Sequence, residues 1–251
     1  MIEDSKNFGS KRMALMIDGD NAQPSLIEDM IVETSKYGMI TIRRIYGDWT
    51  EVNMSGWKDK LQTYAIQPIQ QFRYTTGKNA TDSAMIIDAM DTLYTGGVDG
   101  FCLVSSDSDY TRLATRIREK GFFVMGIGKK NTPRAFVNAC DVFVYTENLG
   151  PAENISKRKK PSKTTSDNSD HVTPDPIPLL KNAFDIAVQD DGWAFLGTMG
   201  HHLRQIDPGF DSRTYGYRQL SQLIRAYPKI FKTKDVKSQD GTLVIYITVV
   251  E

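Results

Sequence analysis

Aspartates that directly follow apolar segments are the residues of this sequence best suited to chemistry. Asp18 ends one apolar run, with Asp20 two positions later, and Asp107 and Asp109 follow a second run in the same way. Carboxylates held close together repel one another unless a cation neutralises them, and hard oxygen ligands favour Mg²⁺ or Mn²⁺. The two segments therefore predict a divalent metal site.

Further polar residues extend this candidate site. Asp82 begins an amphipathic segment, Asp88 lies six residues later on roughly the same side, and Asp141 opens the last apolar segment. The remaining candidates are Asn21, Ser106, Ser108 and Lys78. Aspartate and asparagine also cap helices, serines also satisfy loop backbone, and lysines are often simply solvated, so structural roles remain open for them.

The predicted chemistry is hydrolysis of a phosphodiester bond. A divalent ion can activate a water molecule, hold the phosphodiester and stabilise the leaving oxygen. The first 150 residues contain no histidine, and Cys102 and Cys140 stand in apolar surroundings typical of buried free thiols. Since nothing else there supplies a nucleophile, a metal-dependent nuclease is the favoured interpretation.

The elements that must position these residues follow from the hydrophobic pattern. Strands are expected at 13–17, 40–46, 66–74, 101–105, 122–127 and 142–145, and helices at 24–37, 57–64, 82–94 and 110–120. Alternation of this kind predicts a Rossmann-like three-layer α/β domain with a parallel sheet. Residues beyond the carboxyl ends of parallel strands converge at one edge, although they are far apart in sequence.

Composition narrows the class of protein. The chain has 251 residues, of which 40% are hydrophobic, and its 31 Lys and Arg balance its 31 Asp and Glu. A balance of this kind is untypical of strong non-specific nucleic-acid binders, so any RNA must be held by local patches. No export signal is evident, and no apolar run approaches the roughly 20 residues that cross a bilayer. We therefore expect a cytoplasmic protein that is not attached to a membrane.

A polar segment divides the chain. Residues 150–175 are rich in Pro, Ser, Thr and Lys, which predicts a flexible basic linker between a nuclease domain at 1–149 and a second domain at 176–251. The linker contains four consecutive basic residues, Lys157, Arg158, Lys159 and Lys160. They either contact RNA phosphates or are solvated.

The segment from 176 to 251 has the pattern of a small winged-helix-like α+β domain. Helices are expected at 179–189, 198–205 and 217–227, and strands at 230–233 and 242–249. Arg213 and Arg218 stand among aromatic residues near the third helix, where guanidinium groups could meet RNA phosphates.

Three motifs carry a family resemblance. MALMIDGDNAQPS, KNATDSAMIIDAMDTLY and LVSSDSDYTRLATRIREKG resemble the NYN domain, a PIN-like nuclease family, over roughly 11–148. The resemblance implies cleavage of single-stranded RNA with Mg²⁺ or Mn²⁺. It also implies that Asp18, Asp82 and Asp107 are the main metal-binding, catalytic acids. Supporting roles fall to Asn21, Asp88, Asp109 and Asp141.

The C-terminal stretch GWAFLGTMGHHLRQIDPGFDSRTYGYRQLSQLIRAYPKIF resembles the LOTUS domain, also called OST-HTH, over about 176–250. Such domains are associated with RNA binding in many lineages and with helicase-type protein partners in some. The resemblance implies that RNA, and in some settings a protein, binds this domain. The sequence does not set the oligomeric state.

Two other functions stay open. A haloacid-dehalogenase-like phosphatase also has a strand followed by D-x-D, with Asp18 as the phosphoryl acceptor, although Ala22 stands where that motif usually has threonine. The second is a non-catalytic RNA-binding regulator or adaptor, with a structural cation in the acidic pocket.

Overall fold

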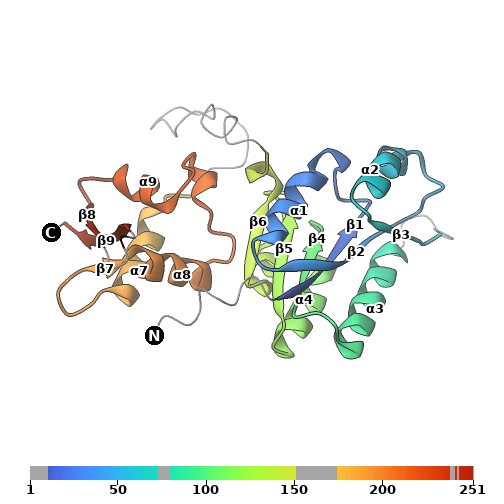
Figure 1. Cartoon of the computed structure of the whole chain (residues 1–251), viewed down its shortest axis with the longest axis horizontal. Helices are drawn as coiled ribbons and strands as arrows, with labels where there is room; N and C mark the ends of the chain where they lie inside the picture. The colour runs from blue at the N-terminus through green and yellow to red at the C-terminus, as the bar shows by residue number, and fades with distance from the viewer. Residues whose placement is uncertain (1–10, 73–79, 151–173, 238–240, 242, 251) are drawn as a thin grey trace. The chain divides into compact units, whose positions relative to one another are not determined.

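The computed structural model describes residues 11–72, 80–150, 174–237, 241 and 243–250. Contacts divide the chain into two compact units, Met1–Gly150 and Pro151–Glu251 (Figure 1). The N-terminal unit is built on a parallel sheet and the C-terminal unit on a small antiparallel sheet. Lys78 and the basic residues 157–160 lie outside the described residues.

The N-terminal unit contains a six-stranded sheet of order β3-β2-β1-β4-β5-β6, in which every neighbouring pair is parallel. Its strands are β1 (Arg12–Asp18), β2 (Met39–Gly47), β3 (Gln67–Gln70), β4 (Gly100–Val104), β5 (Phe123–Gly128) and β6 (Val142–Tyr145). Its α-helices are α1 (Ile27–Ser35), α2 (Lys58–Thr63), α3 (Ala80–Thr95), α4 (Thr111–Glu119) and α5 (Arg134–Ala139). The expected α/β fold with a parallel sheet is confirmed.

The central strand explains why the sheet forms. β1 reads RMALMID, and every residue after Arg12 is buried, because helices cover both faces of the sheet there. Alternate residues point to opposite faces. Ala14 and Met16 pack with the core under α3, α4 and α5, whereas Leu15 and Ile17 pack with the core under α1 and α2 (Figure 1). By this alternation Asp18 belongs to the α3–α4 side.

Several elements differ from the pattern in the sequence. The expected helix 24–37 begins as a 3-10 turn, η3 (Pro24–Leu26), before α1 starts at Ile27. The described part of the third strand is limited to β3 at the edge of the sheet. Helix α5 was not expected, because its six residues give too few turns to establish a helical period.

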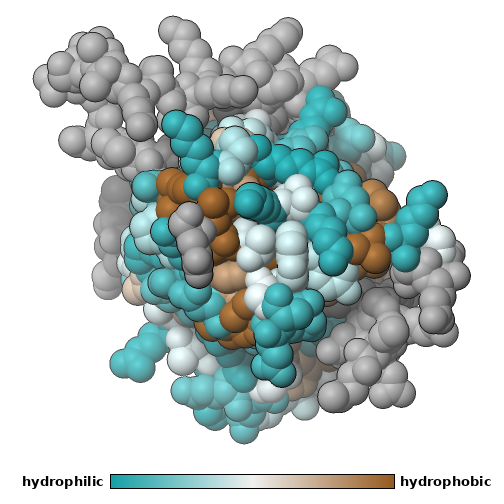
Figure 2. All heavy atoms as spheres, turned by 90° about the vertical axis from the view of Figure 1, so that its left-hand side faces the viewer, coloured by the Kyte–Doolittle hydropathy of each residue, from teal (hydrophilic) through white to brown (hydrophobic). Residues whose placement is uncertain are grey.

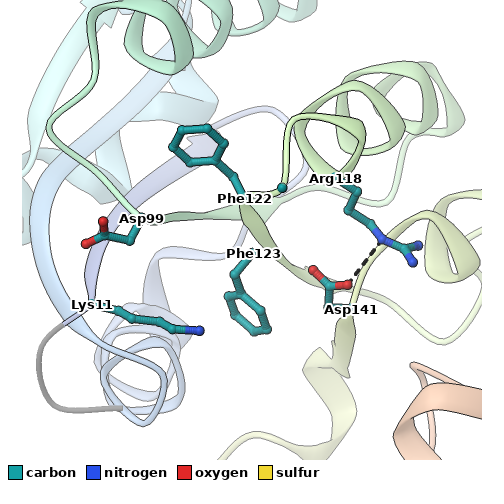
Figure 3. Close-up of a pocket in the computed structure, with 7 residues that line it drawn as sticks. Lys11, Asp99, Arg118, Phe122, Phe123 and Asp141 are labelled. Carbon is teal, nitrogen blue, oxygen red and sulfur yellow. Dashed lines mark ion pairs between the residues drawn. The ribbon is translucent and has the colours of Figure 1, made fainter. Parts of the chain in front are cut away.

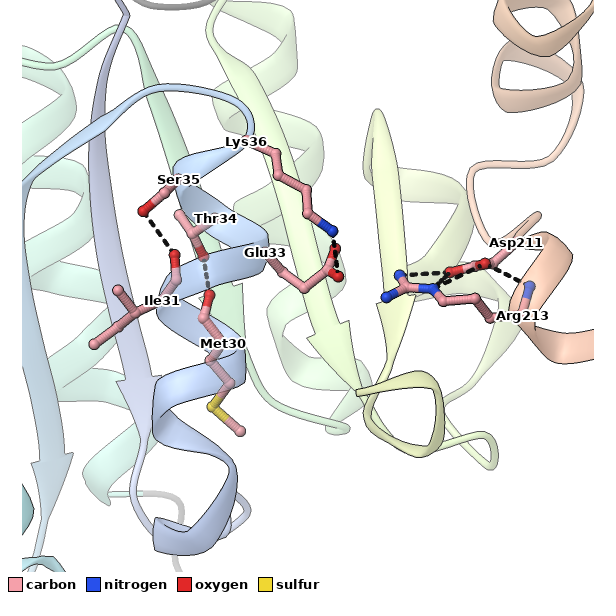
Figure 4. A network of polar contacts seen from close by, with 8 residues as sticks. All are labelled: Met30, Ile31, Glu33, Thr34, Ser35, Lys36, Asp211 and Arg213. Atoms are coloured by element: carbon pink, nitrogen blue, oxygen red, sulfur yellow. Dashed lines mark hydrogen bonds and ion pairs between the residues drawn. The ribbon is translucent and has the colours of Figure 1, made fainter. Parts of the chain in front are cut away.

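The end of α1 is stabilised by its own polar side chains. The hydroxyls of Thr34 and Ser35 each donate to the carbonyl oxygen four residues earlier, at 2.7 Å, and Lys36 pairs with the buried Glu33 at 2.6 Å (Figure 4). These contacts satisfy polar groups on a helix that lies against the sheet. Their role is therefore structural.

The C-terminal unit is a small α+β domain. Its helices are α7 (Ile177–Ala187), α8 (Leu196–Ile206) and α9 (Leu220–Arg225), and its strands are β7 (Ala194–Phe195), β8 (Phe231–Lys237) and β9 (Leu243–Val249). The antiparallel sheet has the order β7-β9-β8. The two-residue strand β7 is too short to leave a pattern in the sequence. No helix in the described part of the chain has both the length and the apolar character needed to cross a membrane.

We predict that Gly126→Ala destabilises the N-terminal unit. Gly126 lies in β5, and a Cβ atom there would stand 2.7 Å from Cε2 of Phe143 and 2.9 Å from Sγ of Cys140, both buried. Overpacking of this kind costs about 1–3 kcal/mol, which urea unfolding would measure. Gly56→Ala is the control, because its nearest neighbour would be 3.4 Å away, at Pro24. Equal stability of the two variants would contradict the tight packing at β5.

Candidate active site

Three strands of the parallel sheet end at the same edge. Asp18 is the last residue of β1, Val104 ends β4, and Gly128 ends β5. Asp107 and Asp109 follow β4 within five residues, so the segments that carry the predicted acids are adjacent in space. This edge, at the carboxyl ends of the strands, is where ligands bind in open α/β sheets.

Three aspartates meet at this edge. One carboxylate oxygen from each of Asp82, Asp107 and Asp109 lies within 4.8 Å of the others. Asp82 stands in the first turn of α3, where the helix dipole favours a negative charge. Asp107 caps the short helix η5 (Ser108–Tyr110) by accepting a 2.9 Å hydrogen bond from the backbone NH of Asp109. We call these three residues the acidic cluster.

Asp18 lies beside the acidic cluster and is fully buried. Its Oδ2 accepts hydrogen bonds from Asn21 Nδ2 at 2.6 Å and from Ser105 Oγ at 2.8 Å. Its Oδ1 accepts from the backbone NH of Asp20 at 3.1 Å. Because Ser105 Oγ also accepts from the backbone NH of Asp107, one serine connects the ends of β1 and β4.

Burial and neighbouring negative charges both raise the pKa values of these acids. Burial raises the pKa of Asp18, although the hydrogen bonds from Asn21 and Ser105 act in the opposite direction, and the charge of Asp82 raises it further. Burial is also the largest cause of the raised pKa of Asp82, followed among the raising causes by the charges of Asp107, Asp109 and Asp20. The ionised site is therefore electrostatically strained in the absence of a cation.

Tyr110 is a member of the site that sequence reasoning missed. Its side chain is fully buried, and its hydroxyl donates a 2.8 Å hydrogen bond to Oδ1 of Asp82. Burial and the nearby carboxylates raise the pKa of Tyr110, so it stays protonated and acts as a donor. The bond holds the Asp82 carboxylate in place. A tyrosine directly after the acidic turn was the available signal.

Asp88 is held away from the acidic cluster by other partners. It forms an ion pair with Arg44 at 2.5 Å and accepts a hydrogen bond from the hydroxyl of Tyr46. Both partners lie on β2. The structure thus assigns Asp88 to a contact between α3 and β2, in contrast to its predicted metal-binding role.

The other predicted neighbours of the cluster take different places. Asp20 stands close enough for its charge to raise the pKa of Asp82. Ser106 Oγ accepts a 2.9 Å hydrogen bond from the backbone NH of Lys129, which follows β5. Ser108 is exposed in η5. The backbone of Lys129 therefore lies at the same edge, at a position that the sequence did not single out.

Asp141 lies at the opposite edge of the sheet. It precedes β6, accepts from the backbone NH of Val124 at 2.8 Å and pairs with Arg118 at 3.2 Å. Figure 3 shows this ion pair lining a pocket near Phe123 and Lys11. The structure thus does not bring Asp141 to the acidic cluster, because a residue before a parallel strand lies at the amino edge.

The predicted RNA-binding arginines of the C-terminal unit differ from each other. Arg213 is only 19% exposed and pairs with Asp211 at 2.7 Å, a contact visible in Figure 4. Asp211 also accepts from the backbone NH of Arg213 at 2.8 Å. Arg218 is exposed, and its backbone NH bonds to Gln222. The Arg213 guanidinium is therefore engaged within the domain.

The acidic cluster has the chemistry of a divalent metal site. Its donors are all carboxylate oxygens, which suit Mg²⁺ or Mn²⁺ better than softer ions. Burial and then the charges of Asp107 and Asp109 raise the pKa of Asp82, and a cation would offset the repulsion between these carboxylates. The residues present therefore fit a divalent ion held by Asp82, Asp107 and Asp109.

The fold and the site define an α/β domain with aspartates gathered at the carboxyl edge of its sheet, in a chain that also carries a small α+β domain. Residues 12–148, more than half of the chain, match the NYN domain model, and residues 169–241 match the OST-HTH/LOTUS domain model. The chain belongs to the NYN domain family and carries an OST-HTH/LOTUS domain after it. The resemblance in the motifs is confirmed.

Three proteins similar to this chain are themselves of unassigned function. An uncharacterized protein of Methanocaldococcus jannaschii is 28% identical over 165 residues, which are 62% of this chain and 64% of that protein. A crystal structure of a protein of unknown function from Vibrio parahaemolyticus matches at 17% identity with a TM-score of 0.46, over 58% of this chain and 96% of that one. An NMR structure of an uncharacterized Nitrosomonas europaea protein matches at 30% identity with a TM-score of 0.28. The match covers 36% of this chain and 91% of that one.

We predict that Mn²⁺ stabilises the protein through the acidic cluster. Ligand binding adds about 2.7 kcal/mol to the free energy of unfolding when the ion is at about one hundred times its dissociation constant. Thermal unfolding should therefore shift upward by several degrees. Asp82→Asn should abolish most of this shift, whereas Asp91→Asn, an exposed aspartate on the same helix, should retain it.

The same variant gives a pH test in metal-free protein. Because the folded-state pKa of Asp82 is raised, its ionisation destabilises the fold increasingly as pH rises through that pKa. Asp82→Asn should consequently be at least as stable as wild type at neutral pH without metal. A clearly less stable variant, or an undiminished Mn²⁺ shift, would contradict the assignment.

We predict that Asp88→Asn mainly affects folding stability. Loss of the charge weakens the contacts with Arg44 and Tyr46, and hydrogen bonds to charged groups contribute about 1.5–3 kcal/mol each. Urea unfolding should detect a loss of that order, while the Mn²⁺-induced rise in melting temperature stays as in wild type. Loss of the Mn²⁺ effect would instead place Asp88 among the ligands.

Proposed function

We propose that the protein is a metal-dependent ribonuclease that cleaves phosphodiester bonds of single-stranded RNA. The observation that carries the proposal is the meeting of Asp82, Asp107 and Asp109 at the carboxyl edge of the sheet. Membership in the NYN domain family supports a nuclease-like fold. The OST-HTH/LOTUS match supports RNA as the substrate.

In this proposal the acidic cluster holds one or more Mg²⁺ or Mn²⁺ ions. The bound metal would supply Lewis acidity toward the phosphodiester and its attacking water. Tyr110 orients the Asp82 carboxylate through its hydrogen bond. Ser105 and Asn21 hold the carboxyl group of Asp18 in one orientation beside the cluster.

Lys129 is proposed to contact the RNA backbone. It follows β5 at the same edge as the acidic cluster, and its backbone NH is fixed by Ser106. A lysine ammonium provides a point charge suited to a phosphate oxygen. The phosphate-binding roles considered for Lys78 and for residues 157–160 remain predictions from the sequence.

The geometry disfavours a phosphatase that uses Asp18 as a phosphoryl acceptor. An attacking carboxylate oxygen must face the substrate, whereas Asp18 is fully buried and both of its oxygens accept hydrogen bonds from the chain. The non-catalytic regulator differs from the ribonuclease in one measurable respect, which is turnover of RNA.

We predict that Asp107→Asn abolishes cleavage. Asparagine keeps an oxygen that can cap η5, as Asp107 does now, but it removes the charge that would hold the metal. Cleavage of fluorescently labelled single-stranded RNA in Mn²⁺ should fall at least about a hundredfold. Asp91→Asn should cleave as wild type does.

Two results would contradict the ribonuclease. Absence of cleavage by the wild-type protein in both Mg²⁺ and Mn²⁺ would favour the RNA-binding regulator. Equal cleavage by wild type, Asp107→Asn and Asp18→Asn would place the activity elsewhere in the chain or in a contaminant.

A further inference from the structure

The small antiparallel sheet of the C-terminal unit has two different faces. Ala194 on β7 and Ile247 on β9 are opposite each other and fully buried, so they mark the face that packs on the helices. Their neighbours Phe195 and Tyr246 form the next pair and point to the other side. Lys234 on β8 pairs with Tyr246 and extends the same row.

We call this second side the outer face. By alternation along the strands it carries Phe195, Lys232, Lys234, Val236, Val244, Tyr246 and Thr248. None of these side chains is fully buried. Figure 2 looks from the side on which β7, β8 and β9 lie in Figure 1, and its hydrophilic surface surrounds pale and apolar areas.

Two aromatic rings occupy the centre of this face. Phe195 is 37% exposed, and its ring centroid lies 6.0 Å from that of Tyr246, with an interplanar angle of 50°. Gly197 leaves room for the Phe195 ring, since a Cβ atom there would stand 2.6 Å from Cε1 of Phe195. The rings are thus supported by the backbone and partly open to solvent.

Two lysines flank the rings. Lys232 and Lys234 are exposed on the same side of β8, about 7 Å apart along the strand. The ammonium group of Lys234 lies 5.2 Å from the centre of the Trp193 ring. This cation–π contact holds the charge next to the aromatic rings.

Two of the described acids near the sheet have other orientations or partners. Asp235 falls on the opposite face by alternation and pairs with Arg225 at 2.8 Å. Asp191 accepts a 3.0 Å hydrogen bond from the backbone NH of Trp193. Within the described strands, the outer face carries positive charge and no carboxylate.

We propose that the outer face binds single-stranded RNA, with unpaired bases stacked on Phe195 and Tyr246 and phosphates at Lys232 and Lys234. This inference rests on the proposed function, which assigns RNA recognition to the C-terminal unit. Aromatic rings beside cations on an open sheet suit unpaired bases, whose faces are free to stack. A duplex presents its phosphates but hides those faces.

The outer face also fits better than the region around Arg213 that the sequence indicated. The guanidinium of Arg213 is paired with Asp211 and largely buried, so RNA would have to displace an internal ion pair. Lys232 and Lys234 are exposed already. RNA binding at the sheet therefore does not require free energy to break an internal ion pair.

The test measures RNA binding by the full chain in EDTA, which prevents metal-dependent cleavage. Fluorescence anisotropy would follow a labelled 12-nucleotide single-stranded RNA of mixed sequence. Phe195→Ala should weaken binding about tenfold, as expected for loss of one stacked base. Lys234→Ala should reduce the slope of log K against log salt by about 0.7, the value for one phosphate contact on a single strand.

Matched variants distinguish a loss of contacts at the outer face from general effects of substitution on the domain. Lys181→Ala and Ile186→Ala remove an exposed charge and an exposed apolar side chain from α7, and both should bind as wild type does. Phe195→Trp keeps a ring and should retain binding, which distinguishes stacking from misfolding. Binding of a duplex of the same sequence should be unaffected by Phe195→Ala.

Wild-type affinity in Phe195→Ala, Tyr246→Ala and Lys234→Ala would overturn the inference. Parallel cleavage assays in Mn²⁺ keep this failure apart from failure of the ribonuclease. If these variants bind RNA as wild type does and RNA is cleaved, only the proposal of RNA binding at the outer face is rejected. If these variants bind RNA more weakly and wild type cleaves no RNA, only the ribonuclease proposal is rejected.

Discussion

Repulsion among the carboxylates at one edge of the sheet is the physical constraint that the N-terminal unit must accommodate. The fold places Asp82, Asp107 and Asp109 within 4.8 Å of one another and Asp18 in the core beside them. Burial and neighbouring charge raise the pKa of both Asp18 and Asp82. A cluster of carboxylates at one edge of the sheet is understandable if a cation binds there, because the cation offsets the repulsion between them. The family assignment agrees with this interpretation.

The rest of the domain supplies the rigidity that such a site needs. β1 and β4 are adjacent and parallel, with apolar cores on both faces, so the segments after them cannot separate. Ser105 joins the two strand ends, and Tyr110 fixes the carboxylate on α3. The C-terminal unit has a hydrophobic core of its own. In our proposals the carboxylates act on the phosphodiester and the outer face of the small sheet selects unpaired bases.

Much of the fold was predictable from sequence because buried parallel strands are short apolar runs, and the position of Asp18 and Asp107 after such runs indicated their shared edge.

Side-chain partners were less predictable. Asp88 has the helical spacing of a ligand, but Arg44 and Tyr46 on a different strand bind it, and no local pattern reveals that pairing. Asp141 shows an avoidable error, because it precedes its strand and so belongs to the amino edge. Strand β7 and the aromatic face of the small sheet depend on contacts between distant residues, which alternation within one strand does not specify.

Titration of the Asp82 side-chain carboxyl by ¹³C NMR would test the central claim most directly. In metal-free protein the account predicts a pKa above the ordinary aspartate value of 3.8, because burial and the charges of Asp107 and Asp109 disfavour ionisation. Addition of diamagnetic Mg²⁺ should lower that pKa, since the ion binds the ionised carboxylate. An ordinary pKa that does not respond to Mg²⁺ would mean that the acids neither repel one another nor share a cation.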